Sequence, residues 1–289
     1  AVLTSRRALL AAAAALPFTR TSAASASSPD PIATTRNGRV KGLREQGVQV
    51  FRGIRYGADT SIRRFARALP PRPWSGIADA TRYGAAAPQV GASEPTSEDC
   101  LVLNLWTPAL DQGRRPVLVY LHGGAHSHGS GSNSLYDGGN LARRGDVVVV
   151  TLNHRLAALG YAYLARLGGP AESGNVGNLD IVLALQWLRD NIAAFGGDPG
   201  NVTLFGQSGG GAKVVTLMAM AEARPLFHKA MTMSGQHVTA AGPQHAMWQK
   251  LTGAWDAVIV SQDPTGAEQR TKGTMTSTKH TDFHTVDSF

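Results

Sequence analysis

The stretch NVTLFGQSGGGAKV, residues 201–214, decides the fold. Its first half is a short apolar run that predicts a buried strand, and its second half can begin a helix. Between the two halves lies Ser208, with a glycine two residues before it and three glycines directly after it. A sharp turn from strand to helix forces a serine into strained backbone angles, and flanking glycines let the two elements pass close to each other. The stretch therefore predicts a serine held on a tight turn.

A serine hydroxyl becomes a nucleophile when it is lifted clear of the backbone, deprotonated by a base and faced by hydrogen-bond donors for the developing oxyanion. The G-x-S-x-G pattern meets the first condition, and the following helix points its positive end at the serine. A second glycine cluster, LHGGAHSHGSG at 121–131, follows another apolar run. We predict Ser208 as the catalytic nucleophile. We predict an oxyanion hole from the N–H groups of Gly124, Ala125 and Gly209, each worth about 3 kcal/mol of barrier; a glycine-rich turn without chemistry is the alternative.

Three apolar runs predict an α/β fold. PVLVYLHGG (116–124), DVVVVTLNHR (146–155) and the run before Ser208 all end in glycine or polar residues, as strands buried on both faces of a parallel or mixed sheet do. Between the last two runs, apolar residues recur at helical spacing before a Gly-Gly stop: Ile181, Leu185, Leu188, Ile192 and Phe195. Strand, helix and strand in this order imply a right-handed crossover in one sheet.

Further upstream, residues 32–57 alternate β-branched and polar residues around the sequence RNGR. The dipeptide Asn37-Gly38 favours a type I′ hairpin turn. We therefore expect a small N-terminal antiparallel sheet in this part of the chain.

The composition favours one large globular domain. The chain has 289 residues, of which 43% are hydrophobic, and this is enough for a sizeable core. Its formal net charge is +8, but lysine and arginine form no block longer than a pair and no aromatic residues interleave with them. We expect no nucleic-acid binding.

Metal and cofactor sites are not indicated either. Cys100 is the only cysteine, which excludes an internal disulfide and any site that needs several cysteines. His122, His126 and His128 lie close together, but no carboxylate or cysteine accompanies them at ligand spacing. We expect no metal and no cofactor, and we expect His122 to be a scaffold residue of the oxyanion loop.

The first residues have the features of an export signal. TSRRALLAAAAALPF, residues 4–18, has paired arginines before an apolar run that is too short to span a membrane. The pair resembles a twin-arginine signal, and residues 24–26 offer small side chains for cleavage. We predict that residues 1–27 are an export signal, and that the protein is periplasmic or extracellular with no stable membrane insertion. An alanine-rich terminus without a signal role is the alternative.

Six motifs follow one another along residues 32–236. They are FRGIRYG (51–57), SEDCLVLNLWTP (97–108), YLHGGAHSHGS (120–130), NHRLAALGY (153–161), GNVGNLDIVLALQWLRDNIAAFGGDPGNVTLFGQSGGG (174–211) and FHKAMTMSGQ (227–236). In this order they resemble the type B carboxylesterases, which include para-nitrobenzyl esterases and cholinesterases. The resemblance implies an α/β-hydrolase fold with a central, mostly parallel sheet. It also implies hydrolysis of small-molecule carboxylic esters through an acyl-enzyme on Ser208.

The resemblance further implies contacts away from the serine. Arg64 with Glu98 and Arg155 with Asp180 are expected to form buried ion pairs with a structural role. The position that pairs with Cys100 in the family is an alanine here, so we expect a buried free thiol.

Family members continue past Gln236 through segments that carry the triad acid and histidine, and we expect this chain to lack those segments. We expect residues 28–247 to be the N-terminal part of an α/β-hydrolase catalytic domain, with its C-terminal part incomplete. Residues 248–289 are expected to be a weakly ordered C-terminal remnant. His245 fits better a stretch in which the family's histidine has no catalytic role. An internal deletion near Met247, or an altered or incomplete gene, explains the pattern economically.

Three functions follow from these observations. The first is a serine carboxylesterase. The second is a catalytically inactive, cholinesterase-like binding module or truncated pseudo-enzyme. The third is a peptidase or lipase of the same fold. Ser208 and both glycine clusters favour the first, and the absence of a placed acid and histidine favours the second. The substrate identity and the oligomeric state have no marker in the sequence.

Overall fold

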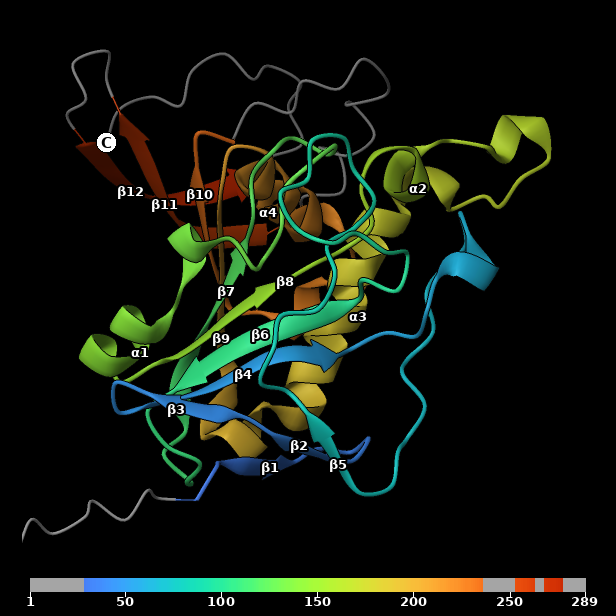
Figure 1. Ribbon diagram of the computed structural model, residues 1–289. Helices are drawn as coiled ribbons and strands as arrows, with labels where there is room; N and C mark the ends of the chain where they lie inside the picture. Colours follow the sequence, from blue (N-terminus) through green and yellow to red (C-terminus); the bar gives the residue numbers. More distant parts are fainter. Residues whose placement is uncertain (1–28, 236–252, 263–267, 278–289) are drawn as a thin grey trace, which may run out of the picture.

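A mixed sheet runs through the middle of the molecule in the computed structural model (Figure 1). The structure describes residues 29–235, 253–262 and 268–277. In these residues, nine strands form the sheet: β3 (Leu43–Glu45), β4 (Val48–Arg55), β6 (Val102–Thr107), β7 (Arg115–Leu121), β8 (Val148–Leu152), β9 (Gly197–Gln207), β10 (Lys229–Met233), β11 (Gly253–Gln262) and β12 (Glu268–Ser277). Their order across the sheet is β12-β11-β10-β9-β7-β8-β6-β4-β3.

The sheet is parallel at its centre and antiparallel at both flanks. The strands β8, β7, β9, β10 and β11 run parallel to one another. On one flank β6, β4 and β3 pair antiparallel, and on the other flank β12 does. Every residue of β6 and β8 is buried, as expected for strands covered on both faces. The predicted α/β class is confirmed.

A small three-stranded sheet lies beside β4 and consists of β1 (Ile32–Thr34), β2 (Arg39–Lys41) and β5 (Ile77–Asp79). The strands β1 and β2 form the predicted antiparallel hairpin, but β2 pairs parallel with β5. The expectation that residues 32–57 form one small sheet is wrong, because β3 and β4 join the main sheet through β6.

The predicted type I′ turn is also wrong. Thr35 and Gly38 exchange backbone hydrogen bonds of 3.0 and 3.3 Å, which makes Arg36 and Asn37 the two turn residues. Neither of them has the positive φ that a type I′ turn requires. The Thr35 hydroxyl donates to the Gly38 carbonyl oxygen at 2.7 Å, and this side-chain bond stabilises the observed turn.

Helices cover both faces of the sheet. They are α1 (Gly139–Gly145), α2 (Ala157–Tyr161), α3 (Val176–Asn191) and α4 (Gly209–Ala219), and 3₁₀ turns lie at Ser61–Arg63, Ser134–Tyr136, Ala165–Leu167, Ser173–Asn175, Ile192–Phe195 and Arg224–Leu226. Side chains of β8 alternate between the faces, since Val148 and Val150 pack in the cluster that includes α3 and Val149 packs in the cluster that includes α1.

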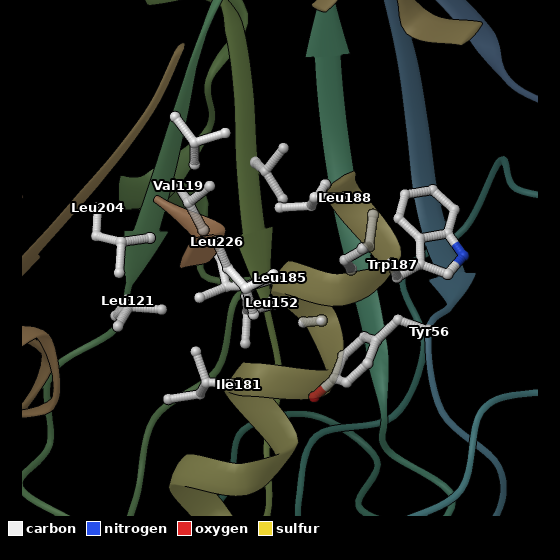
Figure 2. Close-up of a cluster of buried hydrophobic side chains, with 14 of the residues drawn as sticks. Tyr56, Val119, Leu121, Leu152, Ile181, Leu185, Trp187, Leu188, Leu204 and Leu226 are labelled. Atoms are coloured by element: carbon white, nitrogen blue, oxygen red, sulfur yellow. The ribbon is translucent and has the colours of Figure 1, made fainter. Parts of the chain in front are cut away.

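The main core lies between α3 and the strands that lead to the candidate site. Figure 2 shows Ile181, Leu185 and Leu188 of α3 against strand side chains. The strand residues labelled there are Val119, Leu121, Leu152 and Leu204. All are almost fully buried, and burial of each such side chain contributes about 1.5–3 kcal/mol. This packing fixes the carboxyl ends of β7 and β9 relative to each other.

The predicted helix between the apolar runs is confirmed. All five residues that set its spacing are buried. The α-helix ends at Asn191, a 3₁₀ turn continues to Phe195, and Gly196 then adopts a left-handed conformation with φ 75°. The glycine stop signal therefore acts where the sequence predicts it.

Of the two predicted ion pairs, one is buried and one is exposed. Arg155 donates from Nε to Asp180 Oδ2 at 2.8 Å and from Nη2 to Oδ1 at 2.6 Å, and the exposed fractions of the two side chains are 2% and 0%. Arg64 Nε donates to Glu98 Oε2 at 2.8 Å, which confirms the contact. Its side chain is 56% exposed, so the expectation that this pair is buried is wrong.

Cys100 is a buried free thiol, as predicted. Desolvation by burial raises its pKa to about 12, so the thiolate is not populated at neutral pH. A nucleophilic role for this cysteine is therefore excluded.

The terminal predictions fall largely outside the described residues. The predicted export signal at 1–27 lies entirely outside them. Of the expected C-terminal remnant at 248–289, the structure describes the strands β11 and β12. Among the described segments, no helix combines the length and the apolar character needed to cross a membrane.

Candidate active site

Ser208 lies on the turn between β9 and α4, at the carboxyl edge of the sheet. It is the single residue between the last strand residue, Gln207, and the first helix residue, Gly209. Its backbone angles are φ 53° and ψ −125°, a region that costs a side-chain-bearing residue about 1–3 kcal/mol. Two hydrogen bonds hold this geometry: Ser208 N donates to Met233 O at 2.8 Å, and Ala212 N donates to Ser208 O at 3.0 Å.

The Ser208 hydroxyl is not used to cap the helix that follows it. Serine at this position commonly accepts a hydrogen bond from the first turn, but this side chain makes no capping bond. The strained turn therefore leaves the hydroxyl oxygen available for other chemistry.

Gly210, the second residue after Ser208, explains how the turn fits against the neighbouring strand β7. A Cβ built on Gly210 would lie 2.0 Å from the Leu121 carbonyl oxygen, where β7 ends. Only a glycine can occupy this position without moving the backbone. The turn at Ser208 is thus pressed against the end of β7, from which the second glycine cluster begins.

Within that second cluster, residues 123–128, which we call the oxyanion loop after their predicted role, adopt strained backbone angles of their own. Gly124 has φ 87°, and Ala125 has φ 51° although it carries a side chain. The amides of Ser127 and His128 both donate to the Gly124 carbonyl oxygen at 3.2 Å, which closes the loop on itself. The loop therefore has one defined conformation next to the strand end.

The oxyanion loop and the start of α4 are in direct contact. A Cβ built on Gly209 would lie 2.3 Å from the carbonyl oxygen of Ala125 and 2.6 Å from its nitrogen. A Cβ built on Gly123 would lie 3.6 Å from the Ser208 Cβ. The structure thus brings together the four predicted site residues, Ser208, Gly124, Ala125 and Gly209. Their catalytic roles stay predictions.

The chain that folds into this site also matches a known protein family. Residues 29–275 match the carboxylesterase family. The chain belongs to that family. The α/β-hydrolase fold predicted from the motifs is confirmed, since the solved structures that this chain resembles share this fold.

Two curated relatives and one solved structure show how far the similarity extends. Para-nitrobenzyl esterase of Bacillus subtilis (strain 168) is 44% identical over 224 residues, which cover 74% of this chain and 46% of that protein. Phenmedipham hydrolase of Pseudarthrobacter oxydans is 44% identical over 216 residues, or 71% and 43% of the two chains. The crystal structure of a Geobacillus stearothermophilus carboxylesterase is 47% identical with a TM-score of 0.69, covering 71% and 43%. The chain spans less than half the length of these relatives.

Two histidines of this chain stack beside the oxyanion loop. The rings of His122 and His154 are 4.9 Å apart and nearly parallel. Each Nδ1 contacts a backbone carbonyl oxygen at 2.9 Å, that of Gly123 or Arg155, so each Nδ1 carries the proton. Burial, together with the charge of Lys213, lowers the pKa of His122 to about 3 and that of His154 well below its usual value. Both rings are therefore neutral, which suits the scaffold role expected for His122.

Lys213 is the residue that the sequence reasoning missed. Its side chain is fully buried, and Nζ donates to the Ala125 carbonyl oxygen at 2.6 Å and to the Gly209 carbonyl oxygen at 3.3 Å. Burial lowers its pKa to about 7. The signal was present in the sequence, because Lys213 is the single charged residue among the small and apolar residues of α4.

His126 forms part of the loop beside the site. Its half-buried ring packs edge-on against Tyr161 at 4.7 Å, and its carbonyl oxygen accepts from Ala157 N at 2.7 Å. Burial, with a contribution from Lys213, lowers its pKa to about 4, so the ring is neutral at pH 7. The contact ties the loop to α2.

The other two histidines of the described residues, His128 and His228, contact groups other than Ser208. His128 contacts the Ser127 hydroxyl at 3.1 Å. His228 Nδ1 accepts from Val202 N at 3.1 Å, near the amino end of β10, whereas Ser208 N pairs with the last residue of that strand. These two points are about five strand residues, or roughly 16 Å, apart. His245, the candidate base weighed above, lies outside the described residues.

Metal binding has no cluster to support it in the part of the chain that the structure describes. No group of three or more histidine, cysteine, aspartate or glutamate residues there could hold an ion.

Proposed function

We propose that this chain carries the nucleophile and the oxyanion hole of a serine carboxylesterase, which hydrolyses small-molecule carboxylic esters through an acyl-enzyme on Ser208. One observation carries the proposal: Ser208 is strained at the strand-to-helix turn with its hydroxyl uncapped, and the oxyanion loop touches the same turn across Gly209. A strained serine beside loop amides meets two of the conditions for acyl transfer, and a base is the third.

The geometry suggests the following sequence of events. Ser208 Oγ attacks the ester carbonyl carbon and gives up its proton to a general base of the imidazole class, a role that no histidine of the described residues fills by contact with Ser208. The carbonyl oxygen becomes an oxyanion that the N–H groups of Gly124, Ala125 and Gly209 stabilise, at about 3 kcal/mol for each donor. The carbon–oxygen bond to the alcohol then breaks, and the alcohol leaves with a proton. Water attacks the acyl-enzyme and releases the carboxylic acid, which restores the serine.

The substrate class follows from the relatives and from the residue before the serine. The names of the two curated relatives refer to a para-nitrobenzyl esterase and a phenmedipham hydrolase, which supports small organic esters. Gln207 is neutral and exposed, where many family members carry a glutamate. The missing negative charge disfavours cationic esters such as those of choline.

A labelling experiment tests the proposal. The purified chain is treated with a fluorophosphonate, and the mass added to the peptide that contains Ser208 is followed over time. We expect saturating labelling of wild type and none of Ser208→Ala. Labelling of wild type no faster than background hydrolysis of the probe would contradict the proposal.

A catalytically inactive binding module is the second candidate. It is supported by the described histidines, since His122, His154 and His228 contact backbone groups instead of Ser208. A serine without a base loses about six orders of magnitude in turnover in comparable hydrolases. The same labelling experiment decides between the two, because only the esterase reacts at a measurable rate.

We also propose that the protein is exported to the periplasm or the extracellular space. The support is the arginine pair and the short apolar run in residues 4–18. Expression followed by mass spectrometry of the secreted fraction tests this. A mature N-terminus near residue 27 is expected, and an intact N-terminus found only in the cytoplasm would contradict it.

A further inference from the structure

A lysine lies fully buried beside the candidate active site, and no acid in the described part of the chain pairs with it. Lys213 has an exposed fraction of 0%. Among the ion pairs of residues 29–235, none includes this lysine. Burying an amine without a carboxylate is unfavourable unless its N–H groups find other acceptors. The acceptors therefore indicate why a lysine occupies this position.

The acceptors are backbone carbonyls of two separate segments. Nζ donates to Ala125 O at 2.6 Å, on the oxyanion loop, and to Gly209 O at 3.3 Å, on the first residue of α4. These are two of the three residues whose amides are proposed to bind the oxyanion. One side chain thus connects the two segments whose relative position determines the oxyanion hole.

The bond to Ala125 constrains a strained residue. Ala125 has φ 51°, a conformation that a residue with a side chain seldom adopts unless surrounding contacts impose it. A short hydrogen bond to its carbonyl oxygen fixes the plane of the peptide bond that follows. The remainder of the loop is then set by the bonds of Ser127 and His128 to the Gly124 carbonyl oxygen.

We propose that Lys213 is a positioning residue that holds the oxyanion loop against the start of α4 and so sets the geometry of the oxyanion hole; the inference rests on the proposed function of that site.

The tether works in both protonation states of the amine. Burial brings the pKa of Lys213 to about 7, so both forms are present near neutrality. The ammonium has three N–H groups and the neutral amine has two, and the two carbonyl acceptors need only two. The imidazoles nearby do not compete as cations, because their own pKa values are lowered.

The test compares Lys213→Met with a matched variant, Lys229→Met. Methionine keeps an unbranched side chain of similar length but removes the donors. Lys229 is an exposed lysine whose Nζ bonds Asn201 Oδ1 at 2.9 Å, so its replacement controls for loss of a lysine as such. Two quantities are measured on the full chain: hydrogen exchange of the loop amides, and fluorophosphonate labelling of Ser208.

Hydrogen exchange measures the protection of the loop amides directly and does not require catalysis. The informative amides are those of Ser127 and His128, which donate to Gly124 O, and of Ala157, which donates to His126 O. In Lys213→Met these amides should exchange at least about tenfold faster than in wild type, while amides of α3 stay unchanged. Unchanged exchange of the three loop amides would overturn the inference.

Labelling separates positioning from folding. The maximal rate constant of labelling should fall about 10- to 100-fold in Lys213→Met, since a small displacement of oxyanion donors has effects of this order. The concentration of probe that gives half the maximal rate, and the final labelled fraction, should stay within about twofold. A lower labelled fraction with an unchanged rate constant means that lysine only supports folding, and overturns the inference. If wild type itself is not labelled, the proposed function fails, and hydrogen exchange still decides the role of Lys213.

A second variant covers the case in which Lys213→Met does not fold. Lys213→Gln keeps two N–H donors on a side chain one atom shorter. Its loop amides should exchange within about threefold of wild type, and its labelling should recover at least threefold over Lys213→Met where that protein folds. Exchange that rises throughout the chain in Lys213→Gln would indicate a packing role and would overturn the inference.

Discussion

Two buried cations, Arg155 and Lys213, show how differently one chain can accommodate a positive charge. Their exposed fractions are 1% and 0%. Arg155 has a carboxylate partner, Asp180, which it meets with two nitrogens. Among the described residues, Lys213 has only backbone carbonyl oxygens as hydrogen-bond acceptors. A full countercharge maintains a permanent ion pair, whereas carbonyl dipoles only partly offset desolvation, so the pKa of the lysine falls to about 7.

The positions of the two cations agree with this difference. The arginine pair joins the end of β8 to α3, and Arg155 Nη1 also donates to Ala66 O at 2.8 Å, so the pair links parts of the scaffold. The lysine links two segments of the candidate site. A permanent ion pair suits a structural contact between segments of the scaffold. An amine that donates hydrogen bonds to backbone carbonyls suits a site in which the neighbouring backbone amides must be held in one orientation.

The largest effect is expected when the arginine loses its countercharge. Asp180→Asn leaves Arg155 charged and buried without compensation, which should lower the free energy of unfolding by about 3–5 kcal/mol. Urea denaturation followed by circular dichroism measures this loss. If Asp180→Asn were as stable as wild type, Arg155 would not depend on its carboxylate partner, and the contrast with Lys213 would be wrong.

A double variant sharpens the same comparison. Arg155→Met with Asp180→Leu removes both charges and fills the space with apolar atoms. It should be more stable than Asp180→Asn, because the buried charge that carries the penalty is gone. A double variant that is less stable than the single one would mean that the unpaired buried charge is not the cause of the loss in Asp180→Asn.

A smaller effect is expected from the pH dependence of the lysine. The unfolded pKa of lysine is about 10.4, and the folded value for Lys213 is about 7. Between these values the unfolded chain binds more protons at this residue than the folded chain, so the contribution of Lys213 to stability improves as the pH rises and is lost as it falls. The unfolding free energy of wild type minus that of Lys213→Met should rise by about 2 kcal/mol from pH 7 to pH 9.

Chemical denaturation at several pH values measures this slope. Taking the difference cancels groups that titrate in both proteins, such as Cys100, whose pKa is also shifted. The corresponding difference for Lys229→Met should stay flat. A flat difference for Lys213→Met as well would show that its pKa is not lowered in the folded state.

The elements that the sequence predicts well are those whose cause is local. The spacing of Leu185 and its neighbours along α3 needs only one buried face, and the left-handed Gly196 ends the helical segment within the same stretch. The strand-turn-helix at Ser208 is also specified by adjacent residues. The membership of β4 in the main sheet is different, because it depends on pairing with β6, about fifty residues later.

The features of the candidate site also divide into those that neighbouring residues specify and those that depend on tertiary contacts. The glycine patterns point to Ser208 and to the oxyanion loop without any tertiary information. The lone charge on α4 marks Lys213 in the sequence, but its contacts could not be predicted, because its acceptors are backbone carbonyls, which leave no trace in the identity of the residues that provide them. The burial of Arg64 was wrongly expected for a related reason: an ion pair can be inferred from two residues, but its exposure depends on everything packed around it.

The smallest effect is expected at that exposed pair, which has the same chemistry as the buried one. Arg64 Nε donates to Glu98 Oε2 at 2.8 Å, as short as the corresponding bond between Arg155 and Asp180. Solvent screens the exposed charges and hydrates either partner when it is left alone, so Glu98→Gln should have about one tenth of the effect of Asp180→Asn, or less. Urea denaturation in low and high salt measures both variants, and only the Glu98 effect should shrink further with salt. Equal losses in the two variants would mean that the number of hydrogen bonds, and not burial, determines what an unpaired arginine costs this fold.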